Sequence, residues 1–349
     1  MVNMRYYIKC NSMIKIIQSL ESIWYQKKKP PILLIILSKL FGLLTESRRT
    51  LYKIGILSSS KPDIPVIVIG NLNIGGTGKT PLTLFISEIL SQLNKNVGIV
   101  LRGYKGKKSN STPIIMDKDS RPEDFGDEAI YLNQKSNALV CVCTKRAKAA
   151  KLLSEKGVDI ILSDDGLQHL GLKRDLEFGV VSSSRLFGNE YLLPAGPLRE
   201  TLEHIKLLDI MFLNGQPNDE YIEANILLNF EVFNQKVKNY ITNEVRSIDY
   251  FIDREITLIA GIGDPEYLES QLSKIGIKVD HIHIADHEKL DLDNIKDLQA
   301  RTIFMTPKDL IKYTTDELSL ETWELIPEIR IEDSQKQILT EKILEVFND

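Results

Sequence analysis

Residues 66–81, Val-Ile-Val-Ile-Gly-Asn-Leu-Asn-Ile-Gly-Gly-Thr-Gly-Lys-Thr-Pro, decide the fold of this chain. The β-branched run at residues 66–69 predicts a buried parallel strand, and apolar residues at helical spacing over 82–93 predict a helix. The segment between them holds the candidate nucleotide-binding residues Gly75, Gly76, Thr77, Gly78, Lys79 and Thr80. A strand, a glycine-rich loop and a helix in this order form the context that a phosphate-binding loop needs.

The chemistry of this loop suits a nucleoside triphosphate. Its glycines let several backbone N–H groups point at one anion, and the start of the helix adds partial positive charge. Lys79 can reach the terminal phosphates, and the Thr80 hydroxyl can ligate Mg²⁺. Asn73 stands where the usual spacing has glycine, but Asn tolerates a left-handed backbone. The alternative is a turn that binds nothing; the flanking strand and helix favour an enzyme that acts on a nucleoside triphosphate.

The bulk composition is that of a globular protein with one large or two medium α/β domains, because 349 residues can bury a sizeable core. The net charge of −4 is unevenly spread: residues 1–61 hold eleven Lys and Arg against Glu21 and Glu46, which gives +9 there and −13 in the remainder. This asymmetry predicts an acidic surface, either membrane or nucleic acid, as a partner of the N-terminal segment. The three cysteines form no disulfide framework and indicate a reducing cytoplasm.

An apolar run at residues 32–44 follows three lysines at 27–29 and precedes Arg48 and Arg49. Lys39 interrupts the run, which falls short of the ~20 residues that a spanning helix needs. No small-residue cleavage site follows it, so a signal peptide is not indicated. An apolar helix with basic flanks predicts a segment that lies in the membrane interface and is attracted to anionic lipid. Two alternatives stay open: a core helix that packs on the sheet and, less favoured, a helix that spans the membrane.

A second strong signal is the apolar strand predicted at residues 158–163, which ends in Asp164 and Asp165. Carboxylates in this place lie at the edge where doubly wound sheets bind ligands, and an acid there is the expected partner of Mg²⁺ in a P-loop protein. A solvated turn is the alternative. Further strands are predicted at residues 97–101, 138–143, 176–181 and 209–213, and helices begin near residues 125 and 146.

The loop at residues 188–200 has the composition of a rigid functional loop. Two prolines and a glycine fix its shape, and rigid loops carry function more often than mobile ones. Arg199 near its end is free to bind a phosphate or to neutralise charge. The alternative is a solvated side chain, which is the usual state of a lone arginine in a loop.

The alternation of strands and helices breaks at residues 214–254 and restarts afterwards. Segments 229–233 and 237–241 predict a two-stranded ribbon or connector, and the later residues predict a smaller α/β lobe that ends in a strand at 323–329 and a helix at 335–346. The predicted fold class is α/β: a P-loop NTPase-like parallel sheet domain and a smaller α/β lobe joined by a β-ribbon, with an N-terminal membrane-associating helix. The predicted division is 1–53 for the basic N-terminal segment, 54–228 for the P-loop domain, 229–254 for the β-ribbon linker and 255–349 for the C-terminal lobe.

Histidines gather in the second lobe, where His281, His283 and His287 lie near Asp286. His281 and His283 share a strand face, which suits two metal ligands, but no Cys or Glu completes an evident set. Packing or surface roles are therefore the favoured interpretation. His287 stands apart, because it follows the predicted end of a strand, where an active-site cleft would lie.

The chain carries a specific combination of short motifs. They are the loop at 70–81, Arg102-Gly103-Tyr104, Gly126-Asp127-Glu128, Asp-Asp-Gly-Leu-Gln-His at 164–169, Leu-Pro-Ala-Gly-Pro-Leu-Arg-Glu at 193–200, Ala-Gly-Ile-Gly at 260–263 and Asp286-His287. Together they resemble the tetraacyldisaccharide 4'-kinases of lipid A biosynthesis, from about residue 31 to near the C-terminus. The resemblance implies a kinase that uses ATP and Mg²⁺ to phosphorylate the 4'-hydroxyl of a lipid disaccharide 1-phosphate. It also implies a location at the cytoplasmic face of the bacterial inner membrane, peripheral or anchored by the N-terminal helix.

The resemblance implies that Asp127 is the catalytic carboxylate and that His287 is the histidine that pairs with it. The residues that it assigns to the phosphates and the charge of the substrate are Lys79 and Arg199. Its candidates for the Mg²⁺ sphere are Thr80, Glu128, Asp164 and Asp165. One departure from the family pattern lies beside the proposed pair: Glu288 stands where a second histidine is common.

The partners implied by the resemblance are the lipid disaccharide 1-phosphate and anionic lipid of the inner membrane, with no nucleic acid; the sequence identifies no protein partner. Two other functions stay open. A P-loop kinase for another lipid or a soluble metabolite is one, although a soluble acceptor would not need the basic apolar N-terminus. A nucleotide switch that regulates a membrane partner is the other, although it would not explain a histidine delivered from a second lobe. ATP turnover measured with and without acylated disaccharide separates the three.

Overall fold

The computed structural model describes residues 20–26, 28–216, 222–284, 288–292, 301–319 and 321–348. The strands of the larger lobe are β1 (Val66–Gly70), β2 (Val97–Leu101), β3 (Ile114–Ile115), β4 (Leu139–Val142), β5 (Ile160–Asp164), β6 (Leu176–Ser182) and β7 (Ile210–Asn214). Those of the smaller lobe are β10 (Glu255–Ala260), β11 (Lys278–His283) and β12 (Thr302–Met305). The strands that connect the lobes are β8 (Leu227–Asn239) and β13 (Thr322–Ile331), with the short β9 (Val245–Ser247) beside β8.

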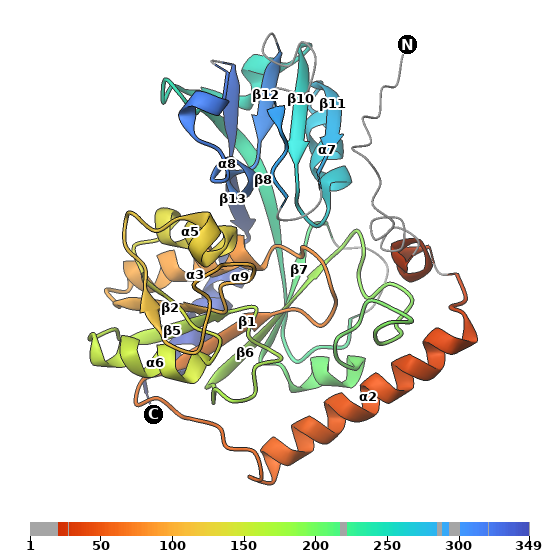
Figure 1. The fold of residues 1–349 in the computed structure, drawn as a ribbon, viewed down its shortest axis with the longest axis vertical. Coiled ribbons are helices and arrows are strands. Elements are labelled where there is room, and N and C mark those ends of the chain that lie inside the picture. Colours follow the sequence, from red (N-terminus) through yellow and green to blue (C-terminus); the bar gives the residue numbers. More distant parts are fainter. Residues whose placement is uncertain are drawn as a thin grey trace.

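Within the described ranges all these strands belong to one sheet, in the order β11-β10-β12-β13-β8-β7-β6-β1-β5-β2-β4-β3. The sheet passes from the smaller lobe to the larger one along β8 and β13 (Figure 1). Pairing is parallel from β4 through β2, β5, β1, β6 and β7 to β8, and again among β10, β11 and β12. The predicted α/β fold class, with a P-loop-type parallel sheet and a second lobe, is confirmed.

The larger lobe has a layer of helices on each face of its sheet. Residues of β1 alternate between two cores: Ile67 and Ile69 pack with α3 (Lys79–Gln92) and α5 (Asp127–Lys135), whereas Val66 and Val68 pack with α6 (Arg146–Glu155). Since both faces are covered, the strand is buried along its whole length, as its unbroken apolar run predicts. The short helix α4 (Pro122–Phe125) leads into α5, and a 3₁₀ helix (Leu202–Leu207) precedes β7. The strand, loop and helix predicted at residues 66–93 are therefore confirmed as β1, the loop and α3.

The connection between the lobes differs from the predicted ribbon. Residues 229–233 and 237–241 were expected to form two strands, but they lie largely within the single strand β8, whose long antiparallel partner is β13. The polar pair Gln235 and Lys236 resembles a turn in the sequence, yet it is an exposed part of β8. A strand that crosses between two lobes has no core to cover its middle, so polar residues there do not end it.

The C-terminal helix α9 (Asp333–Glu345) was expected to complete the smaller lobe, but it packs on the larger one. Its Leu339 and Ile343 are fully buried in the same core as Leu82 of α3. The Asn229 N–H of β8 also donates a hydrogen bond to the side chain of Gln335 (2.6 Å). The reason is topological: β13 carries the chain back from the smaller lobe, so the following helix meets the sheet of the larger one. In the described part of the smaller lobe, the α-helices are α7 (Pro265–Lys274) and α8 (Pro307–Leu310).

Helix α2 (Ile32–Lys53) runs along the outside of the molecule (Figure 1). Ser38 is its buried residue, while Ile32 is 77% exposed and Leu44 69%. The large apolar side chains exposed on it are Ile32, Leu33, Ile36, Leu37, Leu40, Leu43 and Leu44. The alternative of a core helix is therefore wrong. Among the helices of the described ranges, none has the length and apolar character needed to cross a bilayer.

Candidate active site

The glycine-rich loop turns tightly between β1 and α3. Gly75 (φ 115°) and Gly78 (φ 90°) adopt left-handed conformations that other residues rarely take, and Gly78 caps the start of α3. Asn73, at the position where glycine was expected, does not need such a backbone. Its buried side chain instead donates a hydrogen bond to the carbonyl of Leu186 (2.9 Å). In this loop, left-handed backbone conformations therefore fall only on the glycines Gly75 and Gly78, and the substitution at residue 73 does not disturb them.

The loop also meets the smaller lobe, at the Ala-Gly-Ile-Gly motif of residues 260–263. A Cβ atom placed on Gly263 would lie 1.9 Å from the backbone nitrogen of Gly76. Gly263 has no left-handed φ, so crowding rather than backbone conformation requires a glycine there. The two lobes are therefore in backbone contact at the phosphate-binding loop.

Asp164 ends β5 directly beside the start of α3. It is 1% exposed; Oδ1 accepts a hydrogen bond from the Thr83 hydroxyl (3.0 Å), and Oδ2 lies 3.4 Å from the Thr80 hydroxyl. Burial, with a further contribution from the nearby charge of Glu128, raises the pKa of the Asp164 carboxyl to about 6. A carboxylate that is costly to ionise when alone favours a cation beside it.

These residues fit a magnesium ion of the kind that P-loop enzymes hold. No group of three or more His, Cys, Asp or Glu able to hold a metal is found in the described part of the chain. Mg²⁺ at nucleotide sites, however, takes one or two protein ligands and fills the other positions with phosphate oxygens and water. The Thr80 hydroxyl and the buried Asp164 carboxylate provide such a partial set.

Asp165 binds the two cationic side chains that the sequence proposed for phosphate. Lys79 Nζ lies 3.6 Å from Asp165 Oδ1, and Arg199 Nη1 lies 3.1 and 3.3 Å from the two carboxylate oxygens. Burial opposes the charge of Asp165, but Lys79, Arg199 and Arg146 outweigh it and hold its pKa below the usual range. Arg199 is thus held in the site rather than solvated. The charged Asp165 is the anionic partner of both Arg199 and Lys79.

Asp127 and Glu128 open α5 on the other side of the loop and form ion pairs with the smaller lobe. Lys312 Nζ, just after α8, lies 3.8 Å from Asp127 Oδ2, and Lys308 Nζ donates a hydrogen bond to Glu128 Oε1 (3.2 Å). The sequence reasoning missed both lysines. The available signal was their spacing of four residues, which in a predicted helix places two cations on one face.

The histidines of the smaller lobe divide into described and undescribed positions. His281 lies in β11, and its Nδ1 is 2.9 Å from Glu269 Oε2 of α7. His283 ends the same strand. Asp286 and His287 lie outside the described residues, so the predicted pairing of Asp127 with His287 stays a prediction.

A cavity of about 1,060 Å³ joins these groups and is open to both lobes. Its walls include the phosphate-binding loop, the predicted residues Asp127, Glu128, Asp164, Asp165 and Arg199, and from the smaller lobe Gly263, Thr306 and Lys308. His169 also lines it; burial and the charges of Arg146 and Arg174 lower the pKa of this imidazole to about 4, so the ring is neutral near pH 7. The structure therefore brings every predicted site residue that it describes into one cavity.

This arrangement has a counterpart among known proteins. The family model described as Tetraacyldisaccharide-1-P 4'-kinase matches residues 31–346. The chain belongs to the tetraacyldisaccharide 4'-kinase family. Proteins named tetraacyldisaccharide 4'-kinase from Haemophilus influenzae and Colwellia psychrerythraea are 37% and 35% identical to it. The first match covers 90% of this chain and 93% of the relative, and the second covers 93% and 96%.

A solved structure of the same family supports the fold. A crystal structure described as the "apo" form of LpxK from Aquifex aeolicus in complex with ATP has a TM-score of 0.73 and 29% sequence identity to this chain. The match covers 89% of this chain and 97% of that protein. The resemblance of the motifs to the tetraacyldisaccharide 4'-kinases is thereby confirmed, and the chain is a phosphotransferase.

Proposed function

We propose that this chain transfers the γ-phosphate of ATP to the 4'-hydroxyl of a tetraacyldisaccharide 1-phosphate, a late step of lipid A biosynthesis. The observation that carries the proposal is one cavity whose lining combines Lys79, Thr80 and Asp164 with a further carboxylate, Asp127. The first three residues are those that hold a nucleotide and its cation, and the fourth is suited to accept a proton from an alcohol. Family membership and the ATP complex of the Aquifex aeolicus protein support the same assignment.

The groups at the end of β5 would act on the triphosphate. Thr80 and Asp164, with Glu128 nearby, would hold Mg²⁺, and the bound ion would supply neutralisation of charge on the phosphate oxygens. Lys79 reaches the phosphates once they replace Asp165 as its partner, and Arg199 keeps Asp165 in place while that happens. The residues thus stabilise charge that shifts during the transfer, which is the main contribution a protein makes to this chemistry.

The acceptor hydroxyl is a poor nucleophile, so a carboxylate that accepts its proton assists the attack. Asp127 is placed for this role at the start of α5, on the wall of the cavity that both lobes share. His287 remains its proposed partner on the resemblance alone. A base of this kind separates a kinase from a nucleotide switch, which would need no proton acceptor for an alcohol.

The lipid acceptor would be met at the membrane surface. The apolar side chains of α2 are exposed, and its basic flanks suit the anionic lipid of the cytoplasmic face of the inner membrane. Arg48, near the end of α2, also lines the cavity, so the same helix reaches both lipid and active site. We propose that residues 1–53 form this membrane-associating segment.

The remaining domain boundaries are part of the same proposal. The proposed P-loop domain spans residues 54–228, the linker 229–254 and the C-terminal lobe 255–349, with α9 of that last segment packed on the P-loop domain. Strands β8 and β13, rather than the linker alone, provide the physical connection.

Radiolabel transfer from γ-labelled ATP in detergent micelles tests the proposed function. We expect label on tetraacyldisaccharide 1-phosphate and little on the deacylated disaccharide 1-phosphate. Preferential labelling of a soluble sugar would favour the metabolite kinase. ATP hydrolysis that is insensitive to either acceptor would favour the nucleotide switch.

A further inference from the structure

Lys312 connects the two lobes at the place where Asp127 lies. Its side chain is only 8% exposed, and it lies just after α8 in the smaller lobe. Nζ is 2.8 Å from Asp309 Oδ1, donates to the carbonyl of Glu288 (3.1 Å) and lies 3.8 Å from Asp127 Oδ2. The first two contacts are made within the smaller lobe, and the third reaches α5 of the larger one.

Asp309 fixes Lys312 from the side of the smaller lobe. The Asp309 side chain is fully buried, and its Oδ2 accepts hydrogen bonds from the Gly261 N–H (2.9 Å) and the Thr306 hydroxyl (2.6 Å). A buried carboxylate with this many donors has a defined position, and a buried ammonium is stable only beside such anions. The smaller lobe therefore fixes the position of the Lys312 ammonium next to Asp127.

The same carboxylate aligns a second contact between the lobes. Gly261, which donates to Asp309, begins the short turn that ends at Gly263, and Gly263 touches Gly76 of the phosphate-binding loop. Asp309 thus holds both the turn at residues 261–263, which touches the phosphate-binding loop, and the Lys312 ammonium, which lies beside Asp127. A movement of the smaller lobe would change both contacts together.

We propose that Lys312, held by Asp309, is a positioning residue that orients the Asp127 carboxylate toward the acceptor hydroxyl when the lobes are together. The inference rests on the proposed function, in which Asp127 accepts the proton. Lys312 contacts Asp127 and not the reacting atoms, so its loss should slow transfer without weakening nucleotide binding. Lys312 also donates a hydrogen bond to the carbonyl of Glu288, which adds a second fixed partner within the smaller lobe.

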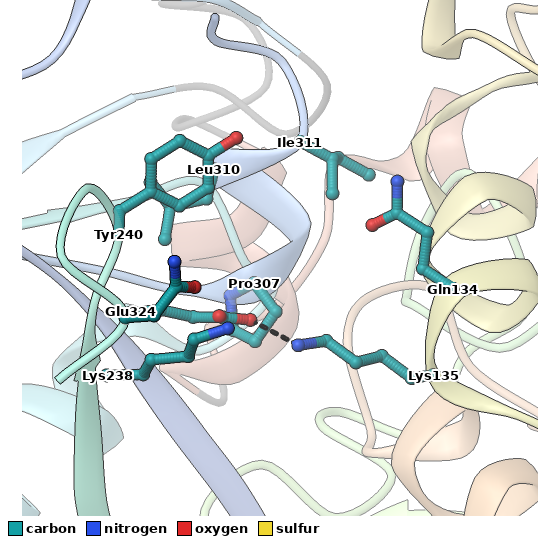
Figure 2. Close-up of a pocket in the computed structure, with 9 residues that line it drawn as sticks. Gln134, Lys135, Lys238, Tyr240, Pro307, Leu310, Ile311 and Glu324 are labelled. Atoms are coloured by element: carbon teal, nitrogen blue, oxygen red, sulfur yellow. Dashed lines mark hydrogen bonds and ion pairs between the residues drawn. The ribbon is translucent and has the colours of Figure 1, made fainter. Parts of the chain in front are cut away.

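Lys135 offers a matched control on the same helix. It ends α5, and its Nζ lies 2.6 Å from Glu324 Oε1 of β13, so it also forms an ion pair between the lobes. Figure 2 shows the two side chains pointing toward each other at a small cavity of about 240 Å³, whose lining shares Pro307 with the active-site cavity but includes neither Asp127 nor Lys312. Lys135→Met therefore removes one connection between the lobes and leaves Asp127 with its partners.

The test measures kcat and the KM for ATP with tetraacyldisaccharide 1-phosphate in micelles. For Lys312→Met we expect kcat to fall about tenfold or more with a nearly unchanged KM, for Lys312→Arg a recovery of most of the loss, and for Lys135→Met little change. In an Asp127→Ala background, Lys312→Met should cause no further loss, because residues that act as a unit are not additive. Normal kcat in folded Lys312→Met, an equal loss in Lys135→Met, or a full additional loss beside Asp127→Ala would each overturn the proposal.

Two further arms keep the test decisive. If Lys312→Met does not fold, the double variant Lys312→Met with Asp309→Asn removes the buried carboxylate left without its cation, and the loss of kcat should persist in it. A normal kcat in that double variant would overturn the proposal. The wild-type protein in the same assay reports on the proposed function separately, since failure of the wild type to label the acceptor would reject the kinase assignment before any variant is compared.

Discussion

The phosphate-binding region of the larger lobe and the junction between the lobes are built in opposite ways. In the first, Lys79, Thr80 and Thr83 come from one helix start and Asp164 and Asp165 from one strand end, and parallel pairing of β1 with β5 brings the two together. In the second, distant segments meet in space, as when Lys312 approaches α5. The first region is encoded in short contiguous motifs, whereas the second exists only when both lobes are in place. Residues that are needed at every stage of the reaction can come from one lobe. Residues that act only after the lobes close can come from both lobes.

The largest expected effect concerns the phosphate-binding region of the larger lobe. Lys79→Ala should reduce transfer by a factor on the order of 10³, because its ammonium stabilises the charge that shifts between phosphates. The fold should persist, since Asp165 keeps its bonds to Arg199. Radiolabel transfer measures the first effect and thermal unfolding the second. Lys151→Ala, an exposed lysine of α6, is the control, and near-normal turnover of folded Lys79→Ala would remove the phosphate-loop assignment.

The second prediction probes the junction through its backbone contact at Gly263 and Gly76. Gly263→Ala places a methyl group where Gly76 already lies, so the lobes must separate or the phosphate-binding loop must shift. A displacement of about 1 Å at a reacting centre can cost about 10²-fold in rate, and we expect a loss of kcat of that order with both lobes folded.

Gly171→Ala is the matched control, because its added Cβ would make only an ordinary contact at 3.6 Å. Equal kcat values for the two variants would show that the reaction does not need this approach of the lobes. A loss confined to Gly263→Ala would establish that the junction, and not the phosphate-binding region alone, sets the rate.

The same difference explains what the sequence could predict. The loop at 75–80, the strand ending in Asp164 and the arginine of the 188–200 loop were all identified, because each depends on local pattern and on the rule that parallel strands end at one edge. The contacts of Lys308 and Lys312 were missed, because no local pattern says which lobe a charged helix face will meet.

The strand partners and the place of α9 were missed for a related reason. A strand pattern records which side is buried but not which strand lies beside it. Segments 229–233 and 237–241 therefore predicted a two-stranded ribbon or connector, whereas they lie largely in β8, whose long partner β13 lies far along the chain. The apolar residues of α9 were recognised as helical, yet only the return path of β13 decides which core receives Leu339.

The third prediction concerns the exposed apolar side chains of α2, which belong to neither region. Leu40→Glu with Leu44→Glu places charges on two exposed apolar positions one turn apart and should weaken binding to vesicles of anionic phospholipid at least about tenfold. ATP hydrolysis without lipid should be unchanged if the phosphate-binding region works independently of the helix. Vesicle sedimentation in low and high salt measures the binding, with Glu46→Gln on the same helix as the control. Undiminished sedimentation of the double variant would reject α2 as the membrane contact.

The smallest effect comes from a charged cluster that, like the lobe junction, joins distant segments. Arg49 of α2, His204 of the 3₁₀ helix and Glu200 are in mutual contact, and His204 Nε2 also lies 3.6 Å from Glu177 Oε2 of β6. Burial disfavours the charged imidazole, but its hydrogen bonds to the two glutamates outweigh burial and raise the pKa of His204. Burial likewise opposes the two carboxylates, yet His204 lowers the pKa of Glu177 and of Glu200.

These directions fix the pH window in which the cluster stabilises the fold. The raised pKa of His204 gives stability that is complete below the unfolded value of 6.5 and is lost as pH rises through the folded pKa. The lowered pKa values of the glutamates give stability that is present above the unfolded value of 4.5 and is lost as pH falls through their folded pKa values. The cluster should therefore contribute most between pH 4.5 and 6.5. His204→Gln should lower the free energy of unfolding there by about 2 kcal/mol, the size of a hydrogen bond to a charged group, and by progressively less toward pH 9. Melting temperatures across this range measure the difference, with the exposed Lys151→Ala as control. A difference in melting temperature between wild type and His204→Gln that stays constant with pH would mean that His204 acts by packing alone. Charge would then not be what holds α2 to the larger lobe.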